Sequence, residues 1–99
     1  MRMCKYEAMF VIKPDLSESE RKNKFQHISD VIAKNNGTVL QSNIWAEKRR
    51  LAFPIKKIHE ATYYLVNFSA PPEAVDSIKQ AYRIDEDILR TLIIKTEGR

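Results

Sequence analysis

The chain has 99 residues, and its 17 lysines and arginines outnumber its 13 aspartates and glutamates, which gives a formal net charge of +4. A chain of this length can bury an apolar core, so we expect residues 1–99 to form one domain without a metal or disulfide scaffold. The positive charge favours an acidic partner such as nucleic acid. Two glycines, Gly37 and Gly98, cannot build a glycine-rich phosphate loop, which excludes nucleotide-binding enzymes of the P-loop and Rossmann types.

The sequence predicts a soluble, intracellular protein. Its one cysteine, Cys4, cannot form an internal disulfide and is interpreted as a small packing residue. No signal-peptide core follows Met1, and no apolar run reaches membrane-spanning length. We therefore expect no membrane contact, no cofactor, no metal ion and no small-molecule substrate.

The first half of the chain predicts a strand, a helix and a second strand. Residues 5–12 are largely apolar at both alternating sets of positions, which is typical of a central strand. Ser17 and Glu20 have the spacing of a capping box and predict a helix start. The helix is expected to stop at residues 35–37, Asn-Asn-Gly, where Gly37 can adopt the left-handed conformation of a C-terminal cap. Residues 38–47 carry β-branched and aromatic side chains and favour a strand. The apolar face of the helix is formed by Phe25, Ile28, Val31 and Ile32.

The second half repeats this order. Residues 61–70 are rich in aromatic and aliphatic side chains at both alternating sets of positions and predict a strand. Residues 71–73, Pro-Pro-Glu, suit the first turn of a helix, where proline needs no donor and a carboxylate meets the positive helix end. Residues 83–87 end this helix, and residues 88–96 predict the last strand. The buried stripe of the second helix contains Val75, Ile78 and Tyr82.

A basic stretch, residues 48–57, joins the two halves without a helix and therefore predicts an antiparallel hairpin. Pro54 lacks a backbone donor, so its strand should lie at a sheet edge or end there. The residues alone leave two interpretations open: contact with RNA phosphates, or a solvated hairpin with Glu47 and Glu60 as counter-charges. The candidate RNA-binding cations of the stretch are Lys48, Arg49, Arg50, Lys56 and Lys57.

Two strand-helix-strand units joined by a hairpin predict an α+β fold, the ferredoxin-like split βαβ sandwich (βαββαβ). Its four-stranded antiparallel sheet has the order 4-1-3-2, with both helices on one face. The other face stays uncovered, and an apolar patch of this kind usually marks an interface. The residues predicted to form this protein-partner face are Met9, Val11, Tyr63 and Leu65 and, depending on the register of the last strand, Leu92 and Ile94.

Apolar side chains also alternate within the basic stretch, at Leu51, Phe53 and Ile55. We expect them to clamp the hairpin onto the body or onto a protein partner in preference to stacking on bases. Stacking on Phe53 or Trp45 stays open, because every base has a π-face.

Two features could suggest catalysis or metal binding. Residues 85–87 form an acidic run, which we interpret as a solvated loop. His27 and His59 lack the spacing of a metal motif, and we expect both at the surface. Neither feature predicts an enzyme.

The chain resembles the family of small-ribosomal-subunit protein six. Residues 47–56, Glu-Lys-Arg-Arg-Leu-Ala-Phe-Pro-Ile-Lys, are similar to a family signature of glycine, a basic pair, Leu-Ala-Tyr-Pro-Ile and a basic residue. Residues 5–7, 63–68 and 83–90 also resemble the family, so the likeness covers essentially the whole chain. The departures from the family pattern are Glu47 and Ala61 in place of glycine, and Phe53 in place of tyrosine.

The resemblance implies a ferredoxin-like structural protein of the small ribosomal subunit and not an enzyme. It also implies binding to the central domain of small-subunit ribosomal RNA, as a heterodimer with small-subunit protein eighteen. On the basis of this resemblance, we favour RNA contact over the solvated hairpin for the cations of residues 48–57. By family position Arg2, Arg83 and Arg90 are further RNA-binding candidates; the alternative is ion pairing with Glu7, Asp85 or Asp87.

The same fold also occurs in proteins with two other functions, and the sequence argues against both. An acylphosphatase-like hydrolase needs a phosphate-cradling loop with an arginine after the first strand. Residues 13–17 instead contain Asp15 and no arginine or glycine, so the loop would repel an anion. A ligand-sensing module that dimerises through its open sheet face would explain the apolar face but not the basic hairpin.

Overall fold

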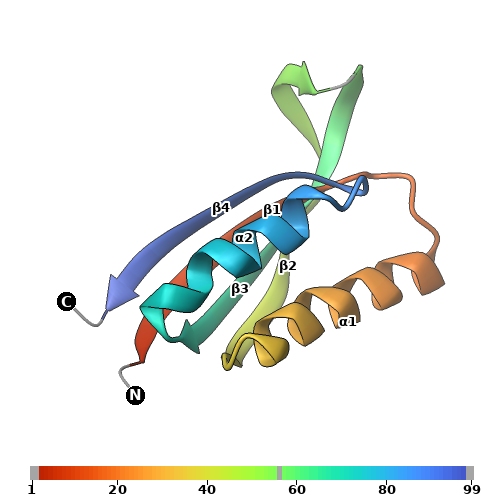
Figure 1. Ribbon diagram of the computed structural model, residues 1–99. Coiled ribbons are helices and arrows are strands. Elements are labelled where there is room, and N and C mark those ends of the chain that lie inside the picture. The colour runs from red at the N-terminus through yellow and green to blue at the C-terminus, as the bar shows by residue number, and fades with distance from the viewer. Residues whose placement is uncertain (1–2, 56, 98–99) are drawn as a thin grey trace.

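The computed structural model describes residues 3–55 and 57–97, the side chain of residue 97 excepted. Seven elements follow along the chain (Figure 1). They are β1 (Cys4–Ile12), α1 (Glu18–Lys34), β2 (Thr38–Ile55), β3 (Ile58–Ala70), the 3₁₀ turn η1 (Pro72–Ala74), α2 (Val75–Arg83) and β4 (Ile88–Glu97). Predictions that concern Arg2 and Lys56 lie outside the described residues.

The four strands form one antiparallel sheet in the order β2-β3-β1-β4. This is the predicted order 4-1-3-2, and Figure 1 shows α1 and α2 together on one face of the sheet. The ferredoxin-like prediction is confirmed. β2, which carries Pro54, is an edge strand as expected, because an edge position does not require the missing donor.

The core lies between the helices and the sheet, where one alternating set of side chains from β1 and β3 meets the apolar stripes of α1 and α2. Phe10 packs edge-on against Tyr82 at 4.8 Å between ring centroids, and Phe25 stacks on Tyr64 at 4.0 Å. The buried Tyr82 hydroxyl donates to the Ile28 carbonyl at 2.7 Å, which ties α2 to α1. Burial, with a smaller contribution from Tyr64, raises the pKa of the Tyr82 phenol.

Local signals explain the two ends of α1. Ser17 and Glu20 form the predicted capping box: the Glu20 amide donates to Ser17 Oγ at 3.2 Å and the Ser17 amide donates to the Glu20 carboxylate at 2.9 Å. These hydrogen bonds lower the pKa of Glu20. At the other end α1 stops at Lys34, directly before the predicted Asn-Asn-Gly, but Asn36 and not Gly37 takes the left-handed conformation, with φ of 65°. Gly37 is needed for space, since a Cβ there would lie 2.6 Å from Ile32 Cγ2.

Two element boundaries also differ from the predictions. The second strand does not end at residue 47 but continues as β2 to Ile55, so it includes most of the basic stretch. The Pro-Pro-Glu segment opens not an α-helix but the 3₁₀ turn η1, which leads into α2 at Val75. Proline fits both kinds of first turn, so the sequence could not distinguish them.

The acidic run at residues 85–87 is only in part the solvated loop we predicted, because Glu86 is exposed but Asp85 is not. The side chain of Asp85 is only 10% exposed; it accepts a hydrogen bond from Lys24 Nζ at 2.5 Å and from the Asp87 amide at 3.0 Å. Burial lowers the pKa of Lys24, but its contacts with Asp85 and Asp87 outweigh this and raise the pKa overall. The run therefore fastens the loop between α2 and β4 to α1. His27 and His59 are exposed, as expected.

Candidate nucleic-acid and protein interface

The basic stretch forms the outer part of the β2–β3 hairpin, which projects beyond the body of the fold (Figure 1). Arg50 pairs with Glu60 and Ile55 pairs with Ile58, so β2 advances five residues while β3 advances two. The extra residues of β2 bulge out of the ladder and overhang the uncovered sheet face. They are the Leu-Ala-Phe-Pro segment, residues 51–54.

A hollow of about 220 Å³ separates this overhang from the sheet and is lined by residues 51–55 together with Val11, Tyr63 and Arg90. Leu51 and Ile55 are half-buried at its edge, which agrees with the predicted clamp. Phe53 does not take part in burial, because 82% of it is exposed. The three alternating apolar residues therefore have two different environments.

The described cations of the hairpin are exposed and point to solvent-accessible space rather than to acids. Lys48, Arg49, Arg50 and Lys57 form no ion pair within residues 3–55 and 57–97. Glu60, predicted as a possible counter-charge, lies opposite Arg50 in the register but makes no such pair with a described residue. The structure thus leaves these charges available for an external anion.

Glu47, the acid that stands next to the basic stretch, is held on the helical side of β2. Its carboxylate accepts a hydrogen bond from Arg21 Nη2 of α1 at 2.5 Å. Glu47 is therefore neutralised by the body of the protein and is not the counter-charge of the hairpin that we considered. Sequence reasoning missed this contact because 26 residues separate the two partners.

Three side chains form a stack beside the hairpin cations. The Arg49 guanidinium lies 4.8 Å from the centroid of the Trp45 ring, and the Trp45 ring meets Tyr63 edge-on at 5.7 Å. Trp45 is 51% exposed although it touches both neighbours. A guanidinium over an indole face is an attractive cation–π arrangement, worth about 0.5–1 kcal/mol at an exposed site.

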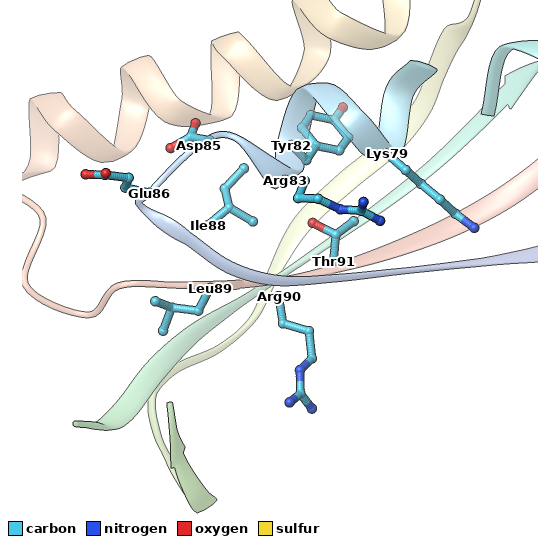
Figure 2. A pocket seen from close by; sticks show the side chains of 9 residues that line it. All are labelled: Lys79, Tyr82, Arg83, Asp85, Glu86, Ile88, Leu89, Arg90 and Thr91. Atoms are coloured by element: carbon cyan, nitrogen blue, oxygen red, sulfur yellow. The ribbon is translucent and has the colours of Figure 1, made fainter. Parts of the chain in front are cut away.

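Arg83 and Arg90, which the family resemblance groups together, lie on different sides of β4 (Figure 2). Arg83 of α2 lies beside a hollow of about 290 Å³ between α2 and β4, with Lys79 next to it and Thr91 below. Arg90 points to the opposite face, where it is paired in register with Val11. Neither arginine forms the alternative ion pairs within the described residues. Lys79, which was not among the predicted cations, lines the same hollow because it lies one helical turn before Arg83.

The six predicted partner-face residues share the sheet face that the helices leave uncovered (Figure 1). Met9 lies between Leu65 and Leu92 in the ladder, and Leu92 is 60% exposed. Ile94 is 48% exposed, but Val11 is only 7% exposed because the overhang covers it. The register of β4 thus places Leu92 and Ile94 on the same face as Met9, and the accessible part of this face is centred on β4. Whether a protein partner binds there stays a prediction.

The chain's relation to known proteins follows from its sequence over nearly its full length. The family model described as Ribosomal protein S6 matches residues 5–95. The chain belongs to the ribosomal protein S6 family. The S6 family is one of ribosomal structural proteins and not of enzymes, and its members are constituents of the small ribosomal subunit, in the cytoplasm of bacteria. These coarser predictions from the sequence are therefore confirmed.

Individual relatives support the same assignment. The chain is 39% identical to the small ribosomal subunit protein bS6 of Caldanaerobacter subterraneus subsp. tengcongensis, over 96% of this chain and 99% of the relative. It is 41% identical to bS6 of Nitratiruptor sp., over 98% of this chain and 75% of the relative. The crystal structure of 30S ribosomal protein S6 from Thermotoga maritima superimposes with a TM-score of 0.86 at 25% identity, covering 96% of this chain and 89% of that one.

Within the described ranges, no cluster of three or more histidine, cysteine, aspartate or glutamate side chains could hold a metal ion. No helix among these residues is long and apolar enough to cross a membrane.

Proposed function

We propose that this S6 family member binds the central domain of small-subunit ribosomal RNA through its basic hairpin, as a heterodimer with small-subunit protein eighteen on the uncovered sheet face. The observation that carries the RNA part is the exposure of four described hairpin cations without an acidic partner among the described residues. Charges that fold in this way retain their full attraction for phosphates, because no internal ion pair has to be broken first.

The hairpin also has a shape suited to a polyanion. It projects from the body, so an RNA backbone can approach it without contact with the helices (Figure 1). Arg49 and Arg50 offer planar guanidinium groups, which can bind a phosphate through two parallel hydrogen bonds. The Arg21–Glu47 ion pair neutralises the acid that directly precedes the hairpin cations in the sequence.

The protein part of the proposal rests on the exposed apolar residues of the uncovered face. Leu92 and Ile94 of β4 are 60% and 48% exposed; Met9 is paired with Leu92 in the ladder, and Leu65 is paired with Met9 on its other side. Burial of such a patch by a partner stabilises a complex by about 25 cal/mol per Å² of apolar surface before the costs of association.

Salt dependence tests the RNA contact. We expect Arg49→Ala and Arg50→Ala each to weaken binding to the central-domain RNA and to reduce the slope of log K against log salt by about 0.7–0.9, the value for one lost phosphate contact. Lys22→Ala is the matched control, since Lys22 is an exposed cation of α1 outside the hairpin. Affinity and slope that stay unchanged in both arginine variants would refute the RNA contact.

A charge placed on the uncovered face tests the protein contact. Leu92→Glu should weaken the heterodimer with protein eighteen at least tenfold, because the new carboxylate would be buried without a partner. Ile84→Glu is the control: Ile84 is 83% exposed but follows α2, away from this face. Equal heterodimer affinity of wild type and Leu92→Glu, measured by calorimetry, would place the partner elsewhere.

A further inference from the structure

Trp45, which contacts both Arg49 and Tyr63, is an exposed side chain that phosphate binding does not use. We propose that Trp45 and Arg49 form a platform on which an unpaired base of the RNA stacks, so that the hairpin binds a base as well as the backbone. This inference rests on the proposed RNA binding but adds a different kind of contact, one that does not depend on charge.

The geometry favours stacking because the flat groups are already ordered. Tyr63 of β3 supports the Trp45 ring edge-on at 5.7 Å, and the Arg49 guanidinium lies 4.8 Å from the ring centroid. Trp45 still exposes 51% of its surface, so the platform is accessible from solvent. Aromatic rings and guanidinium planes are the groups on which proteins stack unpaired bases.

The backbone of β2 explains how Trp45 comes to lie there. The register with β3 shifts between Ile44, opposite Tyr64, and Ala46, opposite Tyr63, which leaves Trp45 as an extra residue in β2. A bulge of this kind re-aims one side chain without ending the strand. Trp45 is thereby directed to the same side as Tyr63 and Arg49, and the Arg21–Glu47 pair lies on the helical side.

The charges around the platform favour RNA over a protein as the occupant. Lys48 and Arg50 flank Arg49 in sequence and are exposed, without an ion pair to any described residue. A base stacked on the platform would have its own phosphates within reach of these cations. A protein partner would have to desolvate several unpaired cations to cover the indole, which is costly and contrary to the depletion of charge at the centres of protein interfaces.

Intrinsic fluorescence reports directly on this site, because Trp45 is the only tryptophan of the chain. The full-length protein is mixed first with protein eighteen, in which any tryptophan is replaced by phenylalanine, and then with the central-domain RNA. We expect little change of Trp45 emission in the first step and strong quenching in the second. Quenching or a blue shift complete in the first step would assign the indole to the protein interface and overturn the proposal.

Substitutions separate stacking from charge. Trp45→Ala should weaken RNA binding about 5- to 150-fold, the range for one lost base–aromatic stack, with an unchanged salt slope. Trp45→Phe should retain affinity within about threefold, because a flat ring remains. Arg49→Lys should weaken binding with an unchanged slope, since it keeps the charge and loses the plane. Thermal melts of each variant confirm that it is folded.

Phe53→Ala is the matched control, because Phe53 is an exposed ring of the same hairpin without a guanidinium in contact among the described residues. We expect it to change the affinity less than about twofold. An equal loss in Phe53→Ala and Trp45→Ala would contradict a dedicated platform. If wild type binds with the expected salt slope but Trp45→Ala binds equally well, the platform is refuted and the phosphate contact stands; absence of RNA binding would refute the proposed function itself.

Discussion

At the end of α1, two neighbouring residues supply two properties that a single glycine often combines: a left-handed backbone conformation and room for close packing. Asn36 takes the left-handed backbone conformation, and Gly37 allows Ile32 of α1 and the Ser69 carbonyl of β3 to come close. Asparagine tolerates positive φ better than most other non-glycine residues, so the left-handed conformation at Asn36 costs little conformational energy. The sequence Asn-Asn-Gly indicated a helix end but could not show which residue would supply which property.

Gly37→Ala should therefore destabilise the fold through crowding and not through backbone strain. Its Cβ would lie 2.6 Å from Ile32 Cγ2 and 2.9 Å from the Ser69 carbonyl oxygen, so we expect a loss of about 1–3 kcal/mol in urea unfolding. The matched control is Asn36→Gly, for which relief of the left-handed conformation and greater freedom of the unfolded chain nearly cancel, leaving a change within about 0.5 kcal/mol. A Gly37→Ala protein as stable as wild type would show that the helix end has room.

At the scale of elements, the two helices are joined by one buried hydrogen bond, from the Tyr82 hydroxyl of α2 to the Ile28 carbonyl of α1. The ring of the same Tyr82 packs edge-on against Phe10 of β1. Tyr82 therefore contacts both α1 and the sheet. The loop that follows α2 is also attached to α1, because Lys24 of α1 forms an ion pair with Asp85 of the loop.

Tyr82→Phe should reduce the free energy of unfolding by about 1 kcal/mol at pH 8, the typical value of one hydrogen bond. The ordinary pKa of tyrosine is 10.0 and that of Tyr82 is raised, so the unfolded phenol ionises at a pH where the folded one keeps its proton. Wild type therefore loses stability as the pH rises above 10, at up to about 1.4 kcal/mol per pH unit. Tyr82→Phe lacks this loss. The difference in free energy of unfolding between wild type and the variant should therefore vanish near pH 11.

Urea unfolding of both proteins at pH 8 and pH 11 measures this convergence. Tyr63→Phe is the control, because the Tyr63 hydroxyl has no hydrogen bond within the described residues and the ring is only half-buried. A stability gap between wild type and Tyr82→Phe that persisted at pH 11 would contradict the raised pKa.

The same scale shows what the sequence could and could not predict. The capping box at Ser17 and the apolar character of residues 5–12 depend on near neighbours, and both led to the correct helix start and the central place of β1. The partners of the Arg21–Glu47 pair are 26 positions apart and those of the Lys24–Asp85 pair 61, so no local sequence pattern predicts either contact. The bulges of β2 likewise depend on how two strands pair, which is why the platform at Trp45 and the separation of Arg83 from Arg90 came only from the structure.

At the scale of the whole molecule, the body and the outer hairpin have separate roles. None of the buried core residues lies between Arg50 and Glu60, whereas four described cations of the predicted RNA surface lie within residues 48–57. Stability and the proposed RNA recognition are thus located in different parts of the chain. This separation explains how an exposed group of like charges is compatible with a stable fold.

Replacement of residues 51–59 by Asn-Gly tests the separation, because Arg50 and Glu60 already pair in register and a two-residue turn can join them. We expect the shortened protein to unfold cooperatively, with stability within about 2 kcal/mol of wild type, since only partly buried apolar surface is lost. Its affinity for the central-domain RNA should fall further than that of Lys22→Ala. Loss of cooperative unfolding, seen by circular dichroism, would mean that the overhang is part of the core.

The irregular edge of β2 has a consequence for the protein before it meets a ribosome. β2 is 18 residues long and unpaired on its outer side, the kind of strand on which a second copy can add and begin a fibril. Its register shifts at four places, Lys48 has φ of 48°, and Pro54 lacks a donor, so no long straight template is offered. The bulges that aim Trp45 and form the overhang therefore also help to keep newly made chains from aggregating while they wait for assembly.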